Sequence, residues 1–266
     1  SYTAGAAANF IQNSGTISGA SPTISAANGY IALTHVNATG TLTLSALNSY
    51  IADNDSAPDD IDIIADTLSA TAKTGIGSGD DLETQVSNFE ATTTSGNIQI
   101  TNIGTVTLKG ISNTSGSVSI TSTANILDDN NDATCLSAPT ITLTCGGSGE
   151  IGGTDGGSGI RPQFLDFANT SGSVSFGSSG NISKIYMNIT GGDYSGGVTF
   201  NSTVSNSFTL GVSNGDYNLS SRVNVPSATA YIYVPNGGLF DNNATTSDIT
   251  ALYTVINTRD GIGTIS

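Results

Sequence analysis

The 266-residue chain contains no tryptophan, a single methionine and only six lysine and arginine residues. Those six basic residues stand against 21 aspartate and glutamate residues, which makes the formal net charge −15. Because phosphate groups are bound through basic side chains, this composition disfavours nucleic acids and anionic membranes as partners. Cations, basic proteins and neutral glycans are compatible with it.

A long apolar segment is also absent from the sequence. No run approaches the ~20 apolar residues that a membrane-spanning helix needs, so we expect no membrane span. No signal-peptide pattern stands at Ser1, and we therefore expect a mature product or an excised part of a longer protein.

Hydrophobic residues make up only 36% of the chain and charged residues 10%. A polar composition of this kind can indicate disorder, but here the apolar residues alternate with polar ones in short runs. Alternation with a period of two, rich in Val, Ile and Thr, is typical of half-buried β-strands. We therefore predict a folded, all-β chain. A helix competes only at residues 85–90, where the likeness to residues 163–167, beside Pro162, favours strand or loop.

Three stretches of the chain resemble one another, each with an acidic segment at its start and an Ile-Gly pair near its end. They run over residues 51–77, 127–152 and 240–263. The spacing from Asp53 to Asp128 equals the spacing from Ile76 to Ile151 (128 − 53 = 151 − 76 = 75). An internal repeat of this kind indicates a stacked architecture in which each unit mainly contacts its neighbours.

A shorter rhythm lies inside the long one: a small residue, a glycine and then an alternating strand. The spacing is 25 from Gly15 to Gly40 (40 − 15) and 20 from Gly96 to Gly116 (116 − 96). Glycine allows a positive φ or a tight turn at a corner, so a turn and strand of about this length match one coil of a parallel β-helix. A β-sandwich is the main alternative, but it does not predict the long internal copy and usually has a more aromatic core.

We interpret residues 1–266 as a single β-solenoid. Residues 50–126 and 127–184 are its two repeat copies, 185–238 a diverged insertion rich in tyrosine, and 239–266 the start of a third copy. The residues that we predict to point into the narrow apolar interior are Ile98, Ile100, Val106, Leu108, Val118, Ile120, Ile141, Leu143, Val174, Phe176, Val198 and Phe200.

The two cysteines, Cys135 and Cys145, flank a short run. They predict a disulfide that closes this run. Because disulfides persist in oxidising compartments, this bond would imply an extracellular setting. The alternative is a pair of buried free thiols. Metal binding by this pair alone is disfavoured, since no further Cys or His stands nearby.

Clustered Asp and Asn in the acidic segments offer the oxygen ligands that Ca²⁺ prefers. The candidate calcium ligands are Asp53, Asp55, Asp128, Asp129, Asp132 and Asp241. Their spacing matches no known calcium-binding loop, and Asp and Asn also favour turns for conformational reasons. Apart from Ca²⁺, the sequence predicts no cofactor.

Paired carboxylates such as Asp128 and Asp129 also suggest a glycan-cleaving enzyme. Against it, the chain has no Trp and scatters its few basic residues. His35 is the only histidine in the sequence, and no pattern of a serine catalytic triad surrounds it. We therefore interpret it as an exposed strand residue. We expect a protein that is not an enzyme.

The segment that runs from Asp66-Thr67-Leu68 through Gly75-Ile76-Gly77 to Ser95-Gly96-Asn97-Ile98 resembles the repeats of filamentous-haemagglutinin-like adhesins and related large bacterial exoproteins. The likeness is best over residues 50–126 and fades between 185 and 235. It implies a right-handed parallel β-helix, export to the cell exterior, and a structural or adhesive role. The cysteine pair and the tyrosine-rich insertion depart from the usual pattern.

The first hypothesis for function is a non-catalytic, extracellular segment of a large exported surface or secreted protein, acting as a stalk or adhesive fibre. Its partners would be neighbouring repeats of the same protein, other copies of itself, glycans, or the surface of a host or neighbouring cell. The second hypothesis is a subunit of an extracellular filament that stacks end to end, because open solenoid ends expose unpaired backbone groups. The third is a glycan-cleaving β-helix enzyme.

Overall fold

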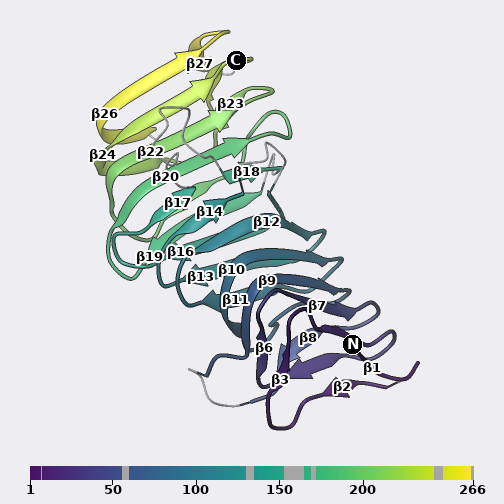
Figure 1. Ribbon diagram of the computed structural model, residues 1–266. Helices are drawn as coiled ribbons and strands as arrows, with labels where there is room; N and C mark the ends of the chain where they lie inside the picture. Colours follow the sequence, from purple (N-terminus) through teal and green to yellow (C-terminus); the bar gives the residue numbers. More distant parts are fainter. Residues whose placement is uncertain are drawn as a thin grey trace. The chain divides into compact units, whose positions relative to one another are not determined.

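The computed structural model describes residues 1–6, 8–55, 60–129, 135–152, 165–168, 172–242 and 248–264. These residues form 27 strands and no helix, and so the described part of the chain holds no helix that could cross a membrane. The strands are mostly parallel and stack in about ten coils, which makes the protein a β-solenoid, or parallel β-helix (Figure 1). The predicted all-β fold is confirmed. The right-handed sense of the coil stays a prediction.

The chain divides into two compact units, Ser1–Thr123 and Ala124–Ser266. The strands of the first unit are β1 (Tyr2–Thr3), β2 (Phe10–Ile11), β3 (Ile17–Gly19), β4 (Thr23–Ser25), β5 (Ile31–Leu33), β6 (Val36–Ala38), β7 (Thr41–Ala46), β8 (Ile51–Asp53), β9 (Ile63–Ala72), β10 (Leu82–Thr93), β11 (Ile98–Asn102), β12 (Val106–Asn113) and β13 (Ser117–Ser122).

The strands of the second unit are β14 (Ile126–Asp128), β15 (Leu136–Ser137), β16 (Thr140–Cys145), β17 (Glu150–Gly152), β18 (Leu165–Phe167), β19 (Ser173–Ser178), β20 (Ile182–Ile189), β21 (Val198–Phe200), β22 (Val204–Val212), β23 (Tyr217–Leu219), β24 (Val223–Val234), β25 (Leu239–Asp241), β26 (Ile249–Thr258) and β27 (Ile262–Thr264).

Within each unit, strands pair in parallel with the strand one coil further along the chain. In the first unit Ile24 of β4 pairs with Leu44 of β7, an offset of 20 in residue number (44 − 24). In the second unit Tyr217 of β23 pairs with Leu239 of β25, an offset of 22 (239 − 217). These offsets confirm the predicted coil length. The step from β16 to β19 is longer, because Ile141 pairs with Val174 at an offset of 33 (174 − 141).

Apolar side chains at equivalent places in successive coils form columns inside each unit. In the first unit one column runs from Leu42 through Leu68 and Phe89 to Leu108, each paired with the next. All four side chains are fully buried, and each contributes about 1.5–3 kcal/mol by leaving water. Every residue predicted to face the interior is buried except Phe200, whose side chain is only half-buried.

The repeated sequence segments occupy equivalent places in the stack. Ile51 forms a parallel bridge with Ile76 in the next coil, and Ile126 pairs with Ile151. In the same way Leu239 pairs with Ile262. In each stretch, therefore, a buried residue just before the acidic segment pairs with the isoleucine of the Ile-Gly pair one coil later.

The predicted corner glycines are needed for two different reasons. Gly96 has a φ of 73°, in the left-handed region that glycine tolerates best. Gly116, one coil further on, has no such φ, but a Cβ atom there would lie 1.6 Å from the carbonyl oxygen of Gly96. The stacking of one coil on the next thus excludes a side chain at Gly116. Residues 85–90 lie inside β10, as the preference for strand over helix predicted.

Candidate functional site

Three aspartates of the first unit lie close enough together to hold one metal ion. Carboxylate oxygens of Asp53, Asp55 and Asp62 all lie within 4.8 Å of one another. Asp53 is the last residue of β8, and its Oδ1 accepts a hydrogen bond of 2.9 Å from the backbone N–H of Asp55. Asp62 directly precedes β9. The two ends of the segment between β8 and β9 therefore bring their acidic side chains to one place.

Asp62 is the most buried member of this group, with none of its surface exposed. Its backbone holds it in the stack, because its N–H donates to the carbonyl of Glu83 and its own carbonyl accepts from the N–H of Val36. One carboxylate oxygen, Oδ2, accepts a hydrogen bond of 3.0 Å from the backbone N–H of Glu83. The other, Oδ1, is buried without any hydrogen-bond partner among the described residues.

The surroundings of Asp62 disfavour its negative charge. Burial, with a further contribution from the neighbouring Asp53 carboxylate, raises the pKa of the Asp62 carboxyl group to about 9. Burial also raises the pKa of Glu83, and the nearby charges of Asp81 and Asp53 act in the same direction. Asp81 in turn accepts a hydrogen bond from the hydroxyl of Thr101. Several carboxyl groups thus share a small, partly buried volume.

Sequence reasoning identified Asp53 and Asp55 but missed Asp62. Asp62 stands between two isoleucines at the start of a strand, where strict alternation with Ile61 and Ile63 predicts an outward side chain. In the structure both Asp62 and Ile63 are buried, because the chain turns just before β9. The sequence signal that could have found Asp62 is its charge, which is unusual at the start of a core strand.

The other predicted calcium ligands do not join such a group within the described residues. Asp128, at the end of β14, is only 7% exposed, and Asp129 follows it half-buried. Asp241, at the end of β25, is half-buried and pairs with Thr264. Asp132 lies outside the described residues. In the parts of the chain that the structure describes, only Asp53, Asp55 and Asp62 meet as three ligands.

The cysteine prediction is wrong in the structure, because Cys135 and Cys145 are both free and buried. They belong to separate columns of strands. The N–H of Cys135 donates to the carbonyl of Asp166, whereas Cys145 ends β16 and pairs with Ser178. Each sulfur occupies an interior position of its own column instead of closing the run between them. Burial raises the pKa of both thiols, and the charge of Asp128 adds to the effect at Cys135.

His35 is also not the exposed strand residue that the sequence predicted. It lies half-buried in the turn between β5 and β6. Its ring Nδ1 is 2.9 Å from the carbonyl oxygen of Ile61. Because a carbonyl only accepts, Nδ1 is the protonated nitrogen in this contact. His35 thereby supports the backbone next to Asp62.

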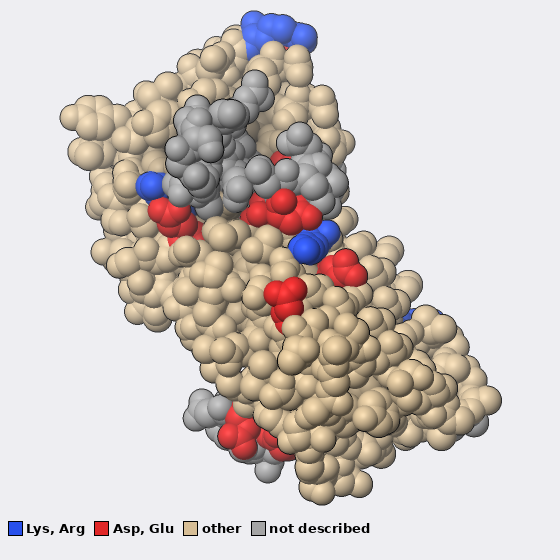
Figure 2. All heavy atoms as spheres, in the orientation of Figure 1, with Lys and Arg blue, Asp and Glu red and all other residues tan. Residues whose placement is uncertain are grey.

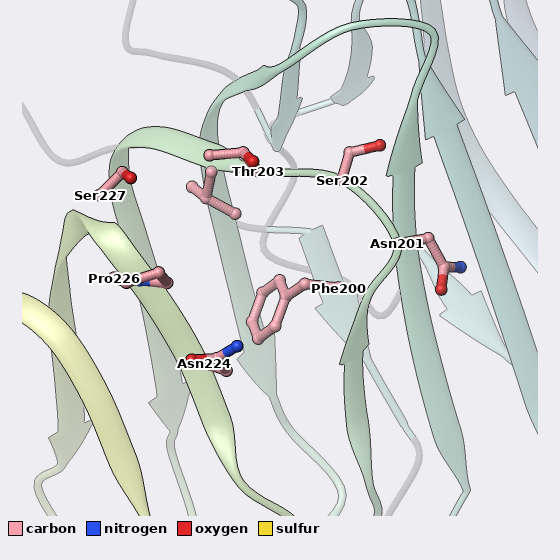
Figure 3. Close-up of a pocket in the computed structure, with 8 residues that line it drawn as sticks. Phe200, Asn201, Ser202, Thr203, Asn224, Pro226 and Ser227 are labelled. Atoms are coloured by element: carbon pink, nitrogen blue, oxygen red, sulfur yellow. The ribbon is translucent and has the colours of Figure 1, made fainter.

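A shallow pocket of about 330 Å³ lies in the second unit, between β21, the start of β22 and β24. Its lining residues are Phe200, Asn201, Ser202, Thr203, Val204, Asn224, Pro226 and Ser227. Figure 3 shows the Phe200 ring pointing toward Asn224 and Pro226. The ring also packs edge-on against Phe208, with centroids 5.0 Å apart. Hydroxyl and amide groups beside an aromatic ring suit a neutral polar ligand.

This pocket has no carboxylate in its lining, so it offers none of the paired acids that glycoside hydrolysis needs. Figure 2 shows acidic side chains in several groups on the face drawn, with fewer basic ones. The ion pairs between described residues are Lys184 with Glu150, at 3.2 Å, and Arg259 with Asp260, at 2.8 Å. Both lie in the second unit, so neither neutralises the Asp53, Asp55 and Asp62 group.

No known protein family, curated protein or solved structure matches the chain. The likeness to filamentous-haemagglutinin-like adhesins therefore stays a prediction from the sequence.

Proposed function

We propose that the chain is a non-catalytic, extracellular segment of a large exported surface or secreted protein, in which the β-solenoid serves as a stalk or adhesive fibre. The likeness of residues 50–126 to the repeats of filamentous-haemagglutinin-like adhesins belongs to this proposal. The observation that carries it is the continuous parallel pairing of coils in each unit. In the first unit it joins β4, β7, β9, β10 and β12 one after another.

Such pairing suits a mechanical role. Within each unit, neighbouring coils are tied together by a ladder of evenly spaced backbone hydrogen bonds and by the buried columns. Polar side chains add further links between coils at the turns: the side-chain amide of Asn48 donates to Asn28 in the preceding coil, at 3.0 Å. Stacked rings do the same, since Tyr30 and Tyr50 lie 4.9 Å apart. A repeat structure with neighbour contacts of this kind resists extension one coil at a time.

Two experiments test the proposed stalk: the first measures how the chain unfolds under force, and the second locates the chain inside or outside the cell. We expect single chains pulled from their two ends to unfold in steps, each releasing the length of one or a few coils, about 20–25 residues at ~3.3–3.6 Å per residue. Antibodies against the chain should also label intact producing cells or their culture medium. Labelling that appears only after the cells are lysed would contradict the extracellular part of the proposal, whatever the pulling experiment shows.

The adhesive part of the proposal rests on the neutral pocket around Phe200. We expect the purified chain to bind neutral glycans on an array, and Phe200→Ala to reduce that binding at least about fivefold, since a hydrophobic ring contact contributes on the order of 1 kcal/mol or more. Tyr186→Ala, elsewhere in the same unit, is the matched control. Binding that is absent, or unchanged in Phe200→Ala, would leave the chain as a stalk without this adhesive site.

A second candidate is a filament subunit, and one observation favours it. In β26, the last long strand described, the side chains of Leu252 and Tyr253 are 60% and 68% exposed, and Val255 is also exposed. A free strand edge with exposed apolar side chains pairs readily with another strand, which would come from a second copy or from a further part of the same protein. Electron microscopy of the isolated chain distinguishes the two, because only a self-assembling subunit forms filaments without additional chain.

A further inference from the structure

We propose that Asp53, Asp55 and Asp62 form a binding site for one hard divalent cation, with Ca²⁺ preferred over Mg²⁺, in the first unit of the solenoid. The site is distinct from the proposed structural role of the whole chain and does not depend on it. It would hold together the end of β8 and the start of β9.

The ligand chemistry fits a hard cation. Three carboxylates from two ends of one segment supply oxygens within 4.8 Å of one another, a separation that a single ion can bridge with metal–oxygen distances of about 2.3–2.6 Å. Ca²⁺ accepts six to eight oxygens in irregular geometry, whereas Mg²⁺ requires near-ideal octahedral geometry and keeps its waters. A site built from three carboxylates on a strand end, a turn and a strand start suits Ca²⁺ better.

The buried carboxylate of Asp62 points independently to a ligand. It is fully buried, and its Oδ1 has no hydrogen-bond partner among the described residues. An unsatisfied buried oxygen costs about 1–3 kcal/mol, and more if it is charged. Cation coordination would satisfy this oxygen directly. A cluster of exposed aspartates with all its oxygens in water would carry no such argument.

The site is restricted to the first of the three related stretches. The shift along the chain that takes Asp53 to Asp128 takes Asp62 to Ser137 (128 − 53 = 137 − 62). The shift that takes Asp53 to Asp241 takes Asp62 to Thr250 (241 − 53 = 250 − 62 = 188). Ser137 and Thr250 both lack a charge, so neither the second nor the third stretch has the same set of three carboxylates. We therefore expect a single site of this kind in the chain, which the stoichiometry of binding tests.

The experiment is calcium titration of the whole chain, freed of metal by a chelator, using isothermal calorimetry and thermal unfolding. We expect one site with a Kd of roughly 10⁻⁴ to 10⁻³ M, in the range of extracellular modules. Mg²⁺ should bind at least about tenfold more weakly. Asp62→Asn should weaken Ca²⁺ binding at least about tenfold, and so should Asp55→Asn, at a position that is only half-buried. Asp66→Asn, an exposed carboxylate on β9, is the matched control and should bind as the parent does.

Circular dichroism of each variant shows that it is folded, so that lost binding is not lost structure. The proposal is overturned if millimolar CaCl₂ produces neither heat nor a rise in melting temperature. It is equally overturned if folded Asp62→Asn and Asp55→Asn both bind Ca²⁺ like the parent chain. Equal affinity for Mg²⁺ would contradict the calcium preference.

Discussion

The carboxyl group of Asp62 determines, at the scale of single residues, how the stability of the first unit depends on pH. Its pKa of about 9 in the folded chain lies above the ordinary value of 3.8. Between about pH 4 and pH 9, the folded state therefore keeps a proton on the Asp62 carboxyl group, whereas the unfolded state has already released it. The resulting stabilisation is fully present below the unfolded pKa and is lost as the pH rises through the folded pKa.

We expect the calcium-free chain to melt at a lower temperature at pH 8 than at pH 5, and Asp62→Asn to remove much of this difference. In a chain of this size 1 kcal/mol corresponds to about 2–4 °C in melting temperature, so the shift should be several degrees. The titratable groups around Asp62 are Asp53, Asp55, Asp81, Glu83 and, through the Ile61 carbonyl, His35. Added CaCl₂ should restore stability at pH 8 more than at pH 5. A melting temperature that rises with pH in the parent chain would contradict this account.

Gly116 provides a second prediction at this scale. A Cβ atom there would lie 1.6 Å from the Gly96 carbonyl oxygen, so Gly116→Ala must push two coils apart. We expect a loss of about 2–4 kcal/mol in the free energy of unfolding, at the upper end of ordinary substitutions. At Gly19 a Cβ atom would meet only Pro22, at 3.8 Å. Gly19→Ala should therefore change stability by no more than about 0.5 kcal/mol, and chemical denaturation of both variants checks the difference.

The two thiols should be unreactive in the folded chain. Both Cys135 and Cys145 are buried, and burial raises their pKa values, so little thiolate forms at neutral pH. We expect a thiol reagent to label both sulfurs only after denaturation, without a reducing agent. Thiols that titrate only after reduction would instead show a disulfide in the isolated protein, against the structure.

At the scale of the strand, β10 shows how one element contributes to the stack. Its alternate side chains face the interior, and Phe89 lies in the column between Leu68 and Leu108. Phe89→Ala leaves a cavity that rigid neighbouring strands fill poorly, and we expect a loss of about 3–5 kcal/mol. Gln85→Ala, on the exposed face of the same strand, should have little effect. Equal effects of the two substitutions in a denaturation experiment would show that β10 does not face the interior as described.

At the scale of the whole chain, charge and exposed strand edges act in opposite directions. A formal charge of −15 keeps copies apart, whereas the apolar side chains on β26 favour association. Raising NaCl from about 0.01 to 0.15 M shortens the screening length from about 30 to 8 Å. If the chain is a filament subunit, light scattering should therefore grow with salt, and Tyr253→Lys should suppress it. Scattering that is independent of salt and of Tyr253 would favour a stalk whose edge is covered by other chain.

The strands, the coil length and the interior could all be predicted from the order of the amino acids. Alternation of apolar and polar residues is a local property that any extended chain expresses, so Ile98, Val118 and most of the predicted interior residues could be assigned without a structure. The long internal copies then indicated stacking, because one coil cannot bury its own apolar face. Alternation also predicted Phe200 to face the interior, but its side chain is only half-buried and lines the pocket beside β24.

Which polar residues meet, in contrast, depends on the folded stack. Asp62 joins Asp53 because a turn before β9 directs its side chain inward, and Glu83 lies beside it because the register between coils places it there. Cys135 and Cys145 are close in sequence, yet they stack along different columns. In a solenoid the residues that touch are about one coil apart along the chain. A small change in that register, which no local pattern encodes, changes every such contact.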